Sequence, residues 1–422
     1  MSLKRISLLL ISAMLIVMAI VVFFERAVIA GASYGASDFF RLYQSVLFYF
    51  SGQDIYSPII VKGGASTYLK VTANLNAPFM MLPLLPLYIV NYAQAYVIWN
   101  MISVMCMLGG AYLALRPFPQ WHRYTLPILA LFLVYFPNVE TLIYGEASAV
   151  LLVPIVLAWL FARENKDIPA GICIGLACAL KLFCGLFLVY FLCQKRFRLL
   201  GVALLSLLVT VLIGGGVFGF ASYSSYYGSL KGIFWYADSW NVSFYGFFMR
   251  LFSDAEQNVP FIYAPYLAKV FTLLCSGVLG AYLIWVWRKG SKQQFDRGFS
   301  LVLVAMLLLS PLAWIYYFPL LLIPYLVIVS EKNDWVHLAA CLLLLFSTKI
   351  PHLVKAADIW TTSQIFWVGG VGFYILLGLL VLLRKSYPEQ RRFAPALWGV
   401  IYALIFLPSL ATMVINFVSL TF

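Results

Sequence analysis

Residues 36–58, ASDFFRLYQSVLFYFSGQDIYSP, are the stretch around which the rest of the chain is organised. Ser37 or Asp38 can cap a short helix here, and Gly52 then ends it. The helix is apolar over most of its surface but too short to cross a bilayer. We therefore expect it to lie in the membrane interface, with Asp38 and Arg41 at its wet end. An acid held there is placed where a water-soluble hydroxyl meets a lipid-borne reagent. The alternative is that Asp38 only caps the helix.

The composition is that of an all-α polytopic membrane protein. The 422 residues are 64% hydrophobic and only 10% charged, with a mean hydropathy of +0.95. Repeated apolar runs of roughly 18 or more residues predict membrane-spanning helices, which satisfy their backbone hydrogen bonds internally. The net charge of +13 follows the predicted topology and does not indicate nucleic-acid binding. The sequence has no glycine-rich nucleotide-binding motif, and its cysteines and histidines have no disulfide or zinc-ligand spacing.

The distribution of basic residues predicts the topology. Basic residues precede a first span, Ile6–Phe24, which therefore starts in the cytoplasm. We expect a single transmembrane domain over residues 1–422, with about 12 or 13 spans. Residues 25–92 form a first periplasmic loop, which holds the helix described above and a second interfacial or re-entrant helix within APFMMLPLLPLYIV. Residues 221–262 form a further periplasmic loop.

Lys181 interrupts the apolar segment Ile168–Cys193, which has basic residues at both ends. The simplest arrangement is a helical hairpin with Lys181 near its outer tip. An ionisable residue inside an apolar segment is costly and indicates a function. A lone cation at a helix break near the outer leaflet could hold a lipid phosphate through charge-assisted hydrogen bonds. The alternative is a lysine that reaches water at an ordinary loop tip.

A second short outer loop holds Glu140, Tyr144 and Glu146. Two acids this close in the sequence can share a proton or hold a cation. The alternative is that the loop is simply solvated. We expect no cofactor and no metal site, although Glu140 and Glu146 are the residues that could bind a divalent cation.

A third outer region, SWNVSFYGFFMRLF, combines amide, hydroxyl and aromatic side chains that suit sugar recognition by hydrogen bonds and ring stacking. The same composition also describes an aromatic belt at the lipid headgroups. The candidates for substrate contact in this region are Trp240, Asn241, Ser243 and Arg250. Further substrate-binding candidates in outer segments are Trp314, Tyr316, Tyr317 and His352.

All of these groups are predicted to face the outside, whereas the cytoplasmic loops are short, basic and chemically plain. A channel or transporter would instead place its polar groups near the bilayer midplane, and the sequence shows no inverted repeat. The pattern favours chemistry at the outer face on a lipid-linked reagent.

Six motifs, in order along most of the chain, resemble the GT-C superfamily of membrane glycosyltransferases, and most of all glycosyltransferase family 87. SDFFRLYQSVLFYFSGQDIYSP and NAPFMMLPLLPL are similar to the first-loop motifs of the family. YGEASAVLL is similar to its G-Q-x-N segment, and PAGICIGLACALKLFCGLFLVYFLCQKRFR to its lysine-containing stretch. SWNVSFYGFFMRLF resembles its G-N-Q-S segment, and LLLSPLAWIYYFPLLLIP its L-L-S-P motif. The family includes polyprenol-phosphate-mannose-dependent mannosyltransferases.

The resemblance implies roles for individual residues. Asp38 matches the first-loop acid and would be the general base. Lys181 matches the lysine that would contact the donor phosphate, and Arg250 matches the arginine of the G-N-Q-S segment. Either Arg250 or Arg41 would assist Lys181 in stabilising the departing phosphate. The chain departs from the family pattern at Glu146, where members have glutamine. It also departs at Leu182, which replaces a proline, and at Tyr316 and Tyr317, which stand where many members have histidines.

The resulting expectation is an inverting glycosyltransferase at the outer face of a bacterial inner membrane. It would transfer one sugar, such as mannose or arabinofuranose, from a polyprenyl-phosphate donor. The acceptor would be a hydroxyl of a glycan, glycolipid or glycoprotein. Two alternatives remain open. One is a transporter or flippase of polyisoprenoid-linked sugars that uses the same outer basic cavity, and the other is a glycan polymerase or ligase.

Overall fold

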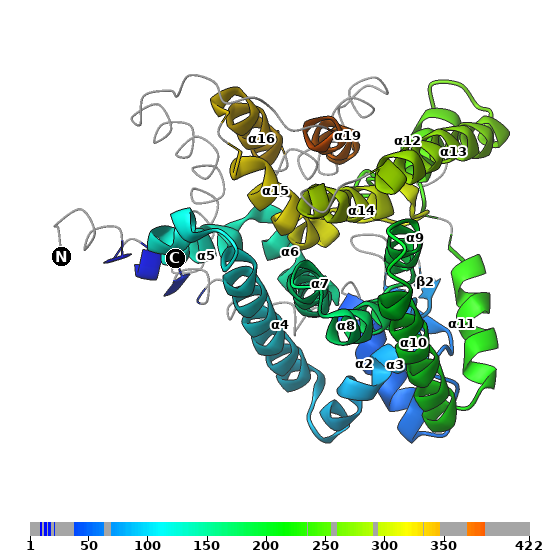
Figure 1. The fold of residues 1–422 in the computed structure, drawn as a ribbon. Coiled ribbons are helices and arrows are strands. Elements are labelled where there is room, and N and C mark those ends of the chain that lie inside the picture. Colours follow the sequence, from blue (N-terminus) through cyan, green and yellow to red (C-terminus); the bar gives the residue numbers. More distant parts are fainter. Residues whose placement is uncertain are drawn as a thin grey trace, which may run out of the picture. The chain divides into compact units, whose positions relative to one another are not determined.

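The computed structural model describes residues 9–10, 12–14, 16–17, 21, 38–62, 69–233, 235–254, 260–289, 294–331, 333–346 and 369–384. Nearly all regular structure in this part of the chain is helical, and the exception is one pair of short strands (Figure 1). The prediction of an all-α polytopic membrane protein is confirmed. The chain divides into two compact units.

Unit 1 comprises Met1–Leu113, Val139–Gly185 and Phe197–Ile233. Helix α8 packs between α7 and α10, and this trio supports the segments that carry the predicted catalytic acid. The elements that lie wholly or mostly in unit 1 are α2 (Asp38–Phe50), β1 (Ile59–Lys62), β2 (Leu69–Thr72), α3 (Pro78–Met81), η1 (Leu82–Ile89), α4 (Tyr92–Leu115), α6 (Phe136–Tyr144), α7 (Ser148–Arg163), α8 (Asp167–Leu180), η3 (Leu182–Gly185), α10 (Phe197–Phe218) and α11 (Ala221–Lys231).

Unit 2 comprises Ala114–Asn138, Leu186–Arg196 and Phe234–Phe422. Helix α14 is buried along most of its length, and it contacts α9, α15 and α19. The elements of unit 2 are η2 (Pro119–Tyr124), α5 (Thr125–Val134), α9 (Leu186–Cys193), α12 (Phe244–Phe252), α13 (Pro265–Lys289), α14 (Phe295–Leu309), η6 (Ile315–Leu321), α15 (Leu322–Val329), α16 (Asp334–Phe346) and α19 (Val371–Leu383).

Three helices of the described chain, α4, α10 and α13, are long and apolar enough to cross a membrane, and the bent pair Pro119–Val134 and Phe136–Tyr144 would count as a fourth span. Several further apolar helices have 10–17 residues. The total of about 12 or 13 spans stays a prediction, because the predicted first span, Ile6–Phe24, lies largely outside the described residues.

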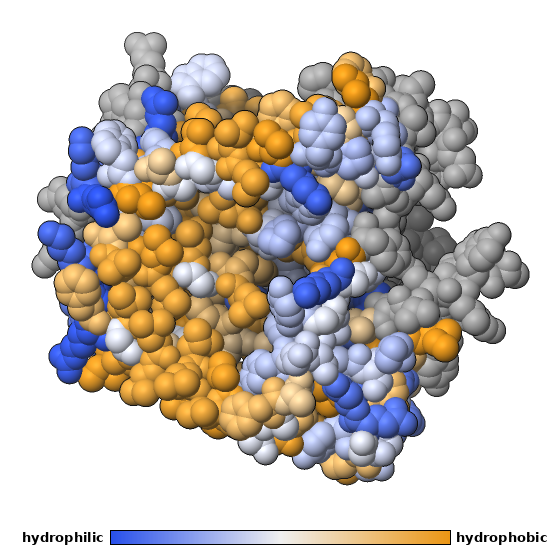
Figure 2. Space-filling model, turned by 90° about the vertical axis from the view of Figure 1, so that its right-hand side faces the viewer, coloured by the Kyte–Doolittle hydropathy of each residue, from blue (hydrophilic) through white to orange (hydrophobic). Residues whose placement is uncertain are grey.

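Exposed apolar surface supports the assignment to a membrane. Helix α10 exposes Leu205, Leu208 and Leu212, and α13 exposes Leu273 and Val278. Figure 2 shows one face of the molecule, on which apolar side chains cover a wide area. Soluble proteins rarely expose contiguous apolar areas of this kind, so this surface is suited to lipid.

Helix α2 confirms the predicted short helix in the first loop. It runs from Asp38 to Phe50, and the chain then turns through Gly52, whose φ of +73° lies in the left-handed region that glycine adopts readily. Phe39, Leu42 and Val46, at helical spacing, are each no more than 1% exposed. This buried face packs against aromatic residues of α4, which fixes the start of α2 within unit 1.

Two predicted loops contain more regular structure than the sequence suggested. The polar strip after Ile59 forms a hairpin in which β1 and β2 pair antiparallel, with Ile59 opposite Thr72. β-branched residues in both strands favour this extended conformation. Residues 221–262, predicted as a loop, contain helices α11 and α12. The second helix predicted in the first loop is present, as the short helix α3 followed by the proline-containing 3-10 helix η1, and its interfacial or re-entrant position stays a prediction.

Candidate active site

Asp38 is the first residue of α2 and forms an ion pair with Arg41, one helical turn later. Arg41 Nη1 donates a hydrogen bond to Asp38 Oδ1, and both side chains are about one-fifth exposed, at 22% and 23%. A carboxylate at this end of a helix also interacts favourably with the helix dipole. The structure therefore holds the Asp38 carboxylate in a defined position and leaves part of it accessible.

Glu146 and Lys181 form a second, more deeply buried ion pair. Lys181 Nζ lies 3.3 Å from Glu146 Oε1, and the two side chains are only 11% and 8% exposed. Helix α8 ends at Leu180, and Lys181 has an extended backbone conformation with φ −145° and ψ 119°. The predicted helix break at Lys181 is confirmed. The break directs the lysine side chain to the turn between α6 and α7, which carries Glu146.

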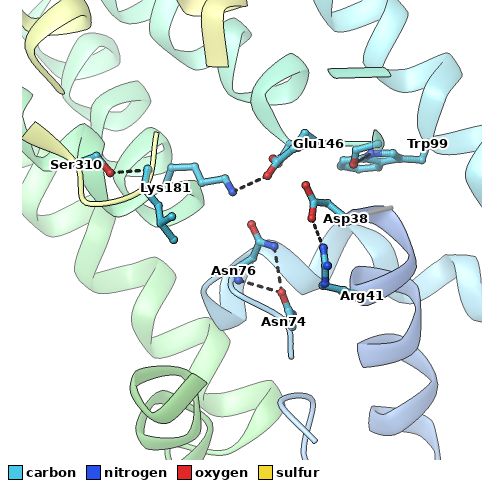
Figure 3. Close-up of polar contacts among 11 residues, drawn as sticks. Asp38, Arg41, Asn74, Asn76, Trp99, Glu146, Lys181 and Ser310 are labelled. Carbon is cyan, nitrogen blue, oxygen red and sulfur yellow. Dashed lines mark hydrogen bonds and ion pairs between the residues drawn. The ribbon is translucent and has the colours of Figure 1, made fainter. Parts of the chain in front are cut away.

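The two ion pairs lie next to each other in unit 1. Figure 3 shows the carboxylates of Asp38 and Glu146 directed toward each other, with Arg41 and Lys181 on their outer sides. Burial raises the pKa of the Glu146 carboxyl, and the negative charge of Asp38 raises it further. Lys181 and the backbone N–H of Ala147, which lies 2.6 Å from Glu146 Oε2, act in the opposite direction. The result is a pKa above the usual value.

Gly145 brings the Glu146 turn into contact with α2. Its φ is +64°, and a Cβ atom built on it would lie 2.5 Å from Cβ of Phe39. The carbonyl oxygen of Gly145 accepts a hydrogen bond of 2.8 Å from Trp99 Nε1, and the Trp99 ring stacks on Phe39 at 5.9 Å. Only glycine combines this backbone conformation with this close approach. The close distance between Asp38 and Glu146 therefore depends on Gly145.

Two asparagines beside these ion pairs were not identified from the sequence. Asn76 Nδ2 and its backbone N–H both donate to Oδ1 of Asn74, at 3.0 and 2.9 Å. Asn74 is fully buried, and Asn76 is 9% exposed. In Figure 3 both lie below the Lys181–Glu146 pair. Asparagines before a proline-initiated helix usually indicate only a turn, so their sequence positions gave no sign of this arrangement.

The prediction that Glu140, Tyr144 and Glu146 share a short outer loop is wrong for two of them. Glu140 and Tyr144 belong to helix α6, and the connection to α7 consists only of residues 145–147. Helix α6 starts with Pro137 near its first turn, where proline is tolerated, and its last turn closes through a hydrogen bond from the Glu146 N–H to the Thr141 carbonyl at 2.9 Å. Glu140 is buried within the unit.

The predicted sugar-binding residues of unit 2 hold two segments together. Asn241 Nδ2 donates to the carbonyls of Tyr236 and Pro311, at 2.9 and 3.0 Å, and its Oδ1 accepts from the Ala313 N–H at 3.2 Å. Ser243 caps helix α12, since its Oγ accepts from the Gly246 N–H at 3.0 Å. These side-chain atoms are engaged with the protein backbone, and a role in substrate binding stays a prediction.

Arg250 is buried in the same cluster. Its Nη1 donates to the carbonyl oxygens of Asp238 and Asn241, at 2.7 and 2.9 Å, and its exposed fraction is 4%. Burial lowers the pKa of its guanidinium to about 10, while the nearby charge of Asp238 acts in the opposite direction. The guanidinium therefore stays charged at neutral pH and orders the backbone around Asn241.

The remaining predicted residues of unit 2 form an aromatic group. Tyr316 stacks on Trp314 at 6.0 Å and meets Trp240 edge-on at 6.3 Å. Tyr316 and Tyr317 are both buried. Trp314 also forms a β-bridge with Asn241. His352 lies outside the described residues.

The structure thus brings four of the predicted residues together in unit 1, and seven others form a separate cluster in unit 2. The four are Asp38, Arg41, Glu146 and Lys181. The seven are Trp240, Asn241, Ser243, Arg250, Trp314, Tyr316 and Tyr317. Among the described residues, no three histidine, cysteine or acidic side chains converge as metal ligands. Metal independence stays a prediction.

The fold and site together define a class: a polytopic helical membrane protein in which paired acids and cations meet at the start of the short helix α2. The family model of glycosyltransferase family 87 matches residues 74–311, which is more than half of the chain. The chain belongs to glycosyltransferase family 87 and is a membrane glycosyltransferase. The matched region contains Glu146, Lys181 and Arg250, and Asp38 precedes it. No curated protein and no solved structure matches the chain.

Proposed function

We propose that this glycosyltransferase uses a polyprenyl-phosphate sugar as donor and transfers one sugar to an acceptor hydroxyl. The transfer takes place at the outer face of a bacterial inner membrane. The observation that carries the proposal is the juxtaposition of the Asp38–Arg41 pair with the buried Glu146–Lys181 pair. A transfer of this kind needs a base for the incoming hydroxyl and a cation for the departing phosphate, and the two pairs offer one of each.

Asp38 is the proposed general base. Its carboxylate is partly exposed and lies at the start of helix α2, so an acceptor hydroxyl that approaches from the aqueous side can reach it. It removes the proton as the acceptor oxygen attacks the anomeric carbon, and such assistance is typically worth about a hundredfold to ten-thousandfold in rate. One displacement inverts the anomeric carbon, so a β-linked donor gives an α-linked product.

Lys181 is the proposed ligand of the donor phosphate. In the structure its ammonium group is paired with Glu146 in a largely buried setting, where a charge interacts more strongly with a phosphate than it does in water. The pair keeps the ammonium group at a fixed place before the donor binds. Arg41, which is paired with Asp38, is the second cation proposed to stabilise the departing phosphate.

The test is sugar transfer by purified protein in proteoliposomes. The donors are radiolabelled polyprenyl-phosphate mannose and polyprenyl-phosphate arabinofuranose, with the corresponding nucleotide sugars as comparison and extracted envelope glycolipids as acceptors. We expect transfer from one polyprenyl-phosphate donor, with inversion. Transfer from a nucleotide sugar would contradict the proposed donor class. Movement of labelled lipid across the bilayer without a new glycosidic bond would favour the transporter.

A further inference from the structure

One polar atom of the Asn76 side chain has no hydrogen-bond partner in the described part of the chain. Asn76 Oδ1 is shielded from solvent and accepts no hydrogen bond from any described residue. Leaving a buried acceptor unpaired is unfavourable, so such an atom in a functional region indicates a ligand that completes it.

The identity of this atom follows from its neighbours. The backbone N–H of Asn76 can only donate, so the Asn74 atom 2.9 Å away must be the oxygen Oδ1. That oxygen can only accept, so the Asn76 side-chain atom 3.0 Å from it must be the nitrogen Nδ2. The unpaired atom of Asn76 is therefore its oxygen, and the amide cannot be flipped without losing the contact with Asn74.

The position of Asn76 is fixed on both sides. Tyr56 donates a hydrogen bond of 2.6 Å to the Asn76 carbonyl, and Asn74 Nδ2 contacts Met81 Sδ at 3.0 Å. All of these groups are buried. A polar atom that is held this firmly and left unpaired is preorganised, so a ligand that binds it meets a small entropic cost from ordering the protein.

The direction of the Asn76 side chain places this oxygen in the candidate active site. In Figure 3 the side chain points toward Lys181 and Glu146. The oxygen is a neutral acceptor, so it would repel a phosphate oxygen, which is also an acceptor, and would bind an O–H group. The hydroxyl closest to a phosphate held by Lys181 belongs to the sugar that is joined to it.

We propose that Asn76 Oδ1 binds a hydroxyl of the donor sugar and thereby contributes to the choice of sugar. This inference rests on the proposed function. Oδ1 is shielded in this structure, so the sugar reaches it when neighbouring side chains adjust on binding, as they commonly do at binding sites. A site built to bond a substrate hydroxyl discriminates strongly against a sugar that lacks it, because the acceptor is then left unpaired.

The test compares the binding of three short-chain analogues of the donor to the full-length protein in detergent. Two probes are farnesyl phosphates that carry β-mannose or β-arabinofuranose on the phosphate, and the third is farnesyl phosphate without a sugar. Asn76→Ala is expected to weaken binding of the preferred farnesyl-phosphate sugar by about two- to tenfold, which corresponds to the loss of one hydrogen bond. Binding of farnesyl phosphate is expected to equal that of wild type. Lys181→Met is expected to weaken the binding of all three probes.

Two further variants separate binding from folding. Asn76→Ser removes the amide oxygen, while the serine hydroxyl can still donate a hydrogen bond to Asn74. If Asn76→Ala fails to fold, Asn76→Ser should show the selective loss of binding to the sugar-carrying probe. Asn100→Ala is the matched control, because Asn100 is a buried asparagine of α4 whose Oδ1 is also unpaired among the described residues. It should leave the affinity ratio between sugar phosphate and farnesyl phosphate unchanged.

The outcomes distinguish this inference from the proposed function. If wild type prefers a sugar phosphate and Asn76→Ser keeps that preference in full, Asn76 does not bind the sugar, although the proposed function stands. A raised KM for the acceptor with unchanged donor affinity would also overturn the assignment to the donor sugar. If no probe binds to wild type, the proposed function fails first.

Discussion

Lys181 Nζ lies 3.3 Å from Glu146 Oε1, and the contact joins two positions that are 35 residues apart in the chain. It connects the end of α8 to the turn between α6 and α7. Both side chains are largely buried, so each charge depends on the other for compensation. This relationship explains how an apolar segment accommodates a lysine, and it places a cation beside Asp38.

The Glu146–Lys181 pair should behave as a coupled unit in stability measurements. Lys181→Met leaves the Glu146 carboxylate buried without this partner and is expected to destabilise the protein by about 3 kcal/mol. The double variant, Lys181→Met with Glu146→Gln, should lose less unfolding free energy than the sum of the losses of the two single variants. The difference is expected to be about 1–3 kcal/mol. Thermal unfolding in detergent measures all four proteins. Strict additivity would show that the two side chains do not interact.

Glu146 should make the stability of the protein depend on pH. Its pKa is raised in the folded protein above the ordinary value of 4.5, so the folded state binds more protons than the unfolded state above that pH. Stability is then greatest at low pH with respect to this group, and it falls as the pH rises from about 4.5 through the folded pKa. Glu146→Gln should flatten this part of the Tm-against-pH profile. Parallel profiles for the two proteins would exclude Glu146 as the source.

Gly145 should be intolerant of a side chain. Gly145→Ala combines a left-handed backbone conformation with a Cβ 2.5 Å from Phe39 Cβ, and it is expected to cost about 1–3 kcal/mol and to reduce transfer strongly. Gly52→Ala is the control, because Gly52 has a similar φ of +73° but no atom within 4 Å of the added Cβ. It should lose stability through backbone strain alone and keep most activity. Equal losses of activity would show that contact with α2 is unimportant.

Arg250 should be needed for folding of unit 2 in a way that lysine cannot replace. Its Nη1 bridges two backbone carbonyls, and the shorter reach and single ammonium of lysine do not reproduce the planar guanidinium. Arg250→Lys is expected to lower the unfolding temperature, with a free-energy loss of about 1–3 kcal/mol. Binding of farnesyl phosphate to the same variant tests the donor role. Unchanged stability with weakened binding would assign Arg250 to the donor phosphate.

The sequence alone predicted the local features that have local causes. The apolar spacing of Phe39, Leu42 and Val46 indicated helix α2, Gly52 indicated its end, and the charge of Lys181 inside an apolar run indicated a helix break. Each of these follows from residues within one or two turns of one another. The family resemblance inferred from these motifs was likewise confirmed, by the match of glycosyltransferase family 87 to residues 74–311.

The features that sequence reasoning missed depend on contacts between distant segments. The pairing of Glu146 with Lys181 and the approach of Gly145 to Phe39 join separate helices, so no spacing rule predicts them. The hydrogen bonds between Asn74 and Asn76 are local, but asparagines before a proline-initiated helix usually indicate only a turn, so these two positions gave no signal. Aromatic composition was ambiguous in residues 221–262, since it fits a headgroup belt, a sugar site and a packed helix equally well.

The most direct test of the central claim is the rate of sugar transfer by Asp38→Asn in proteoliposomes. Asp54→Asn is the matched control, because Asp54 is an exposed acid of the same first loop, outside the two ion pairs. We predict that Asp38→Asn folds normally and that its transfer rate falls about a hundredfold or more, whereas Asp54→Asn remains near wild type. Transfer by Asp38→Asn at the wild-type rate would contradict the assignment of Asp38 as the general base.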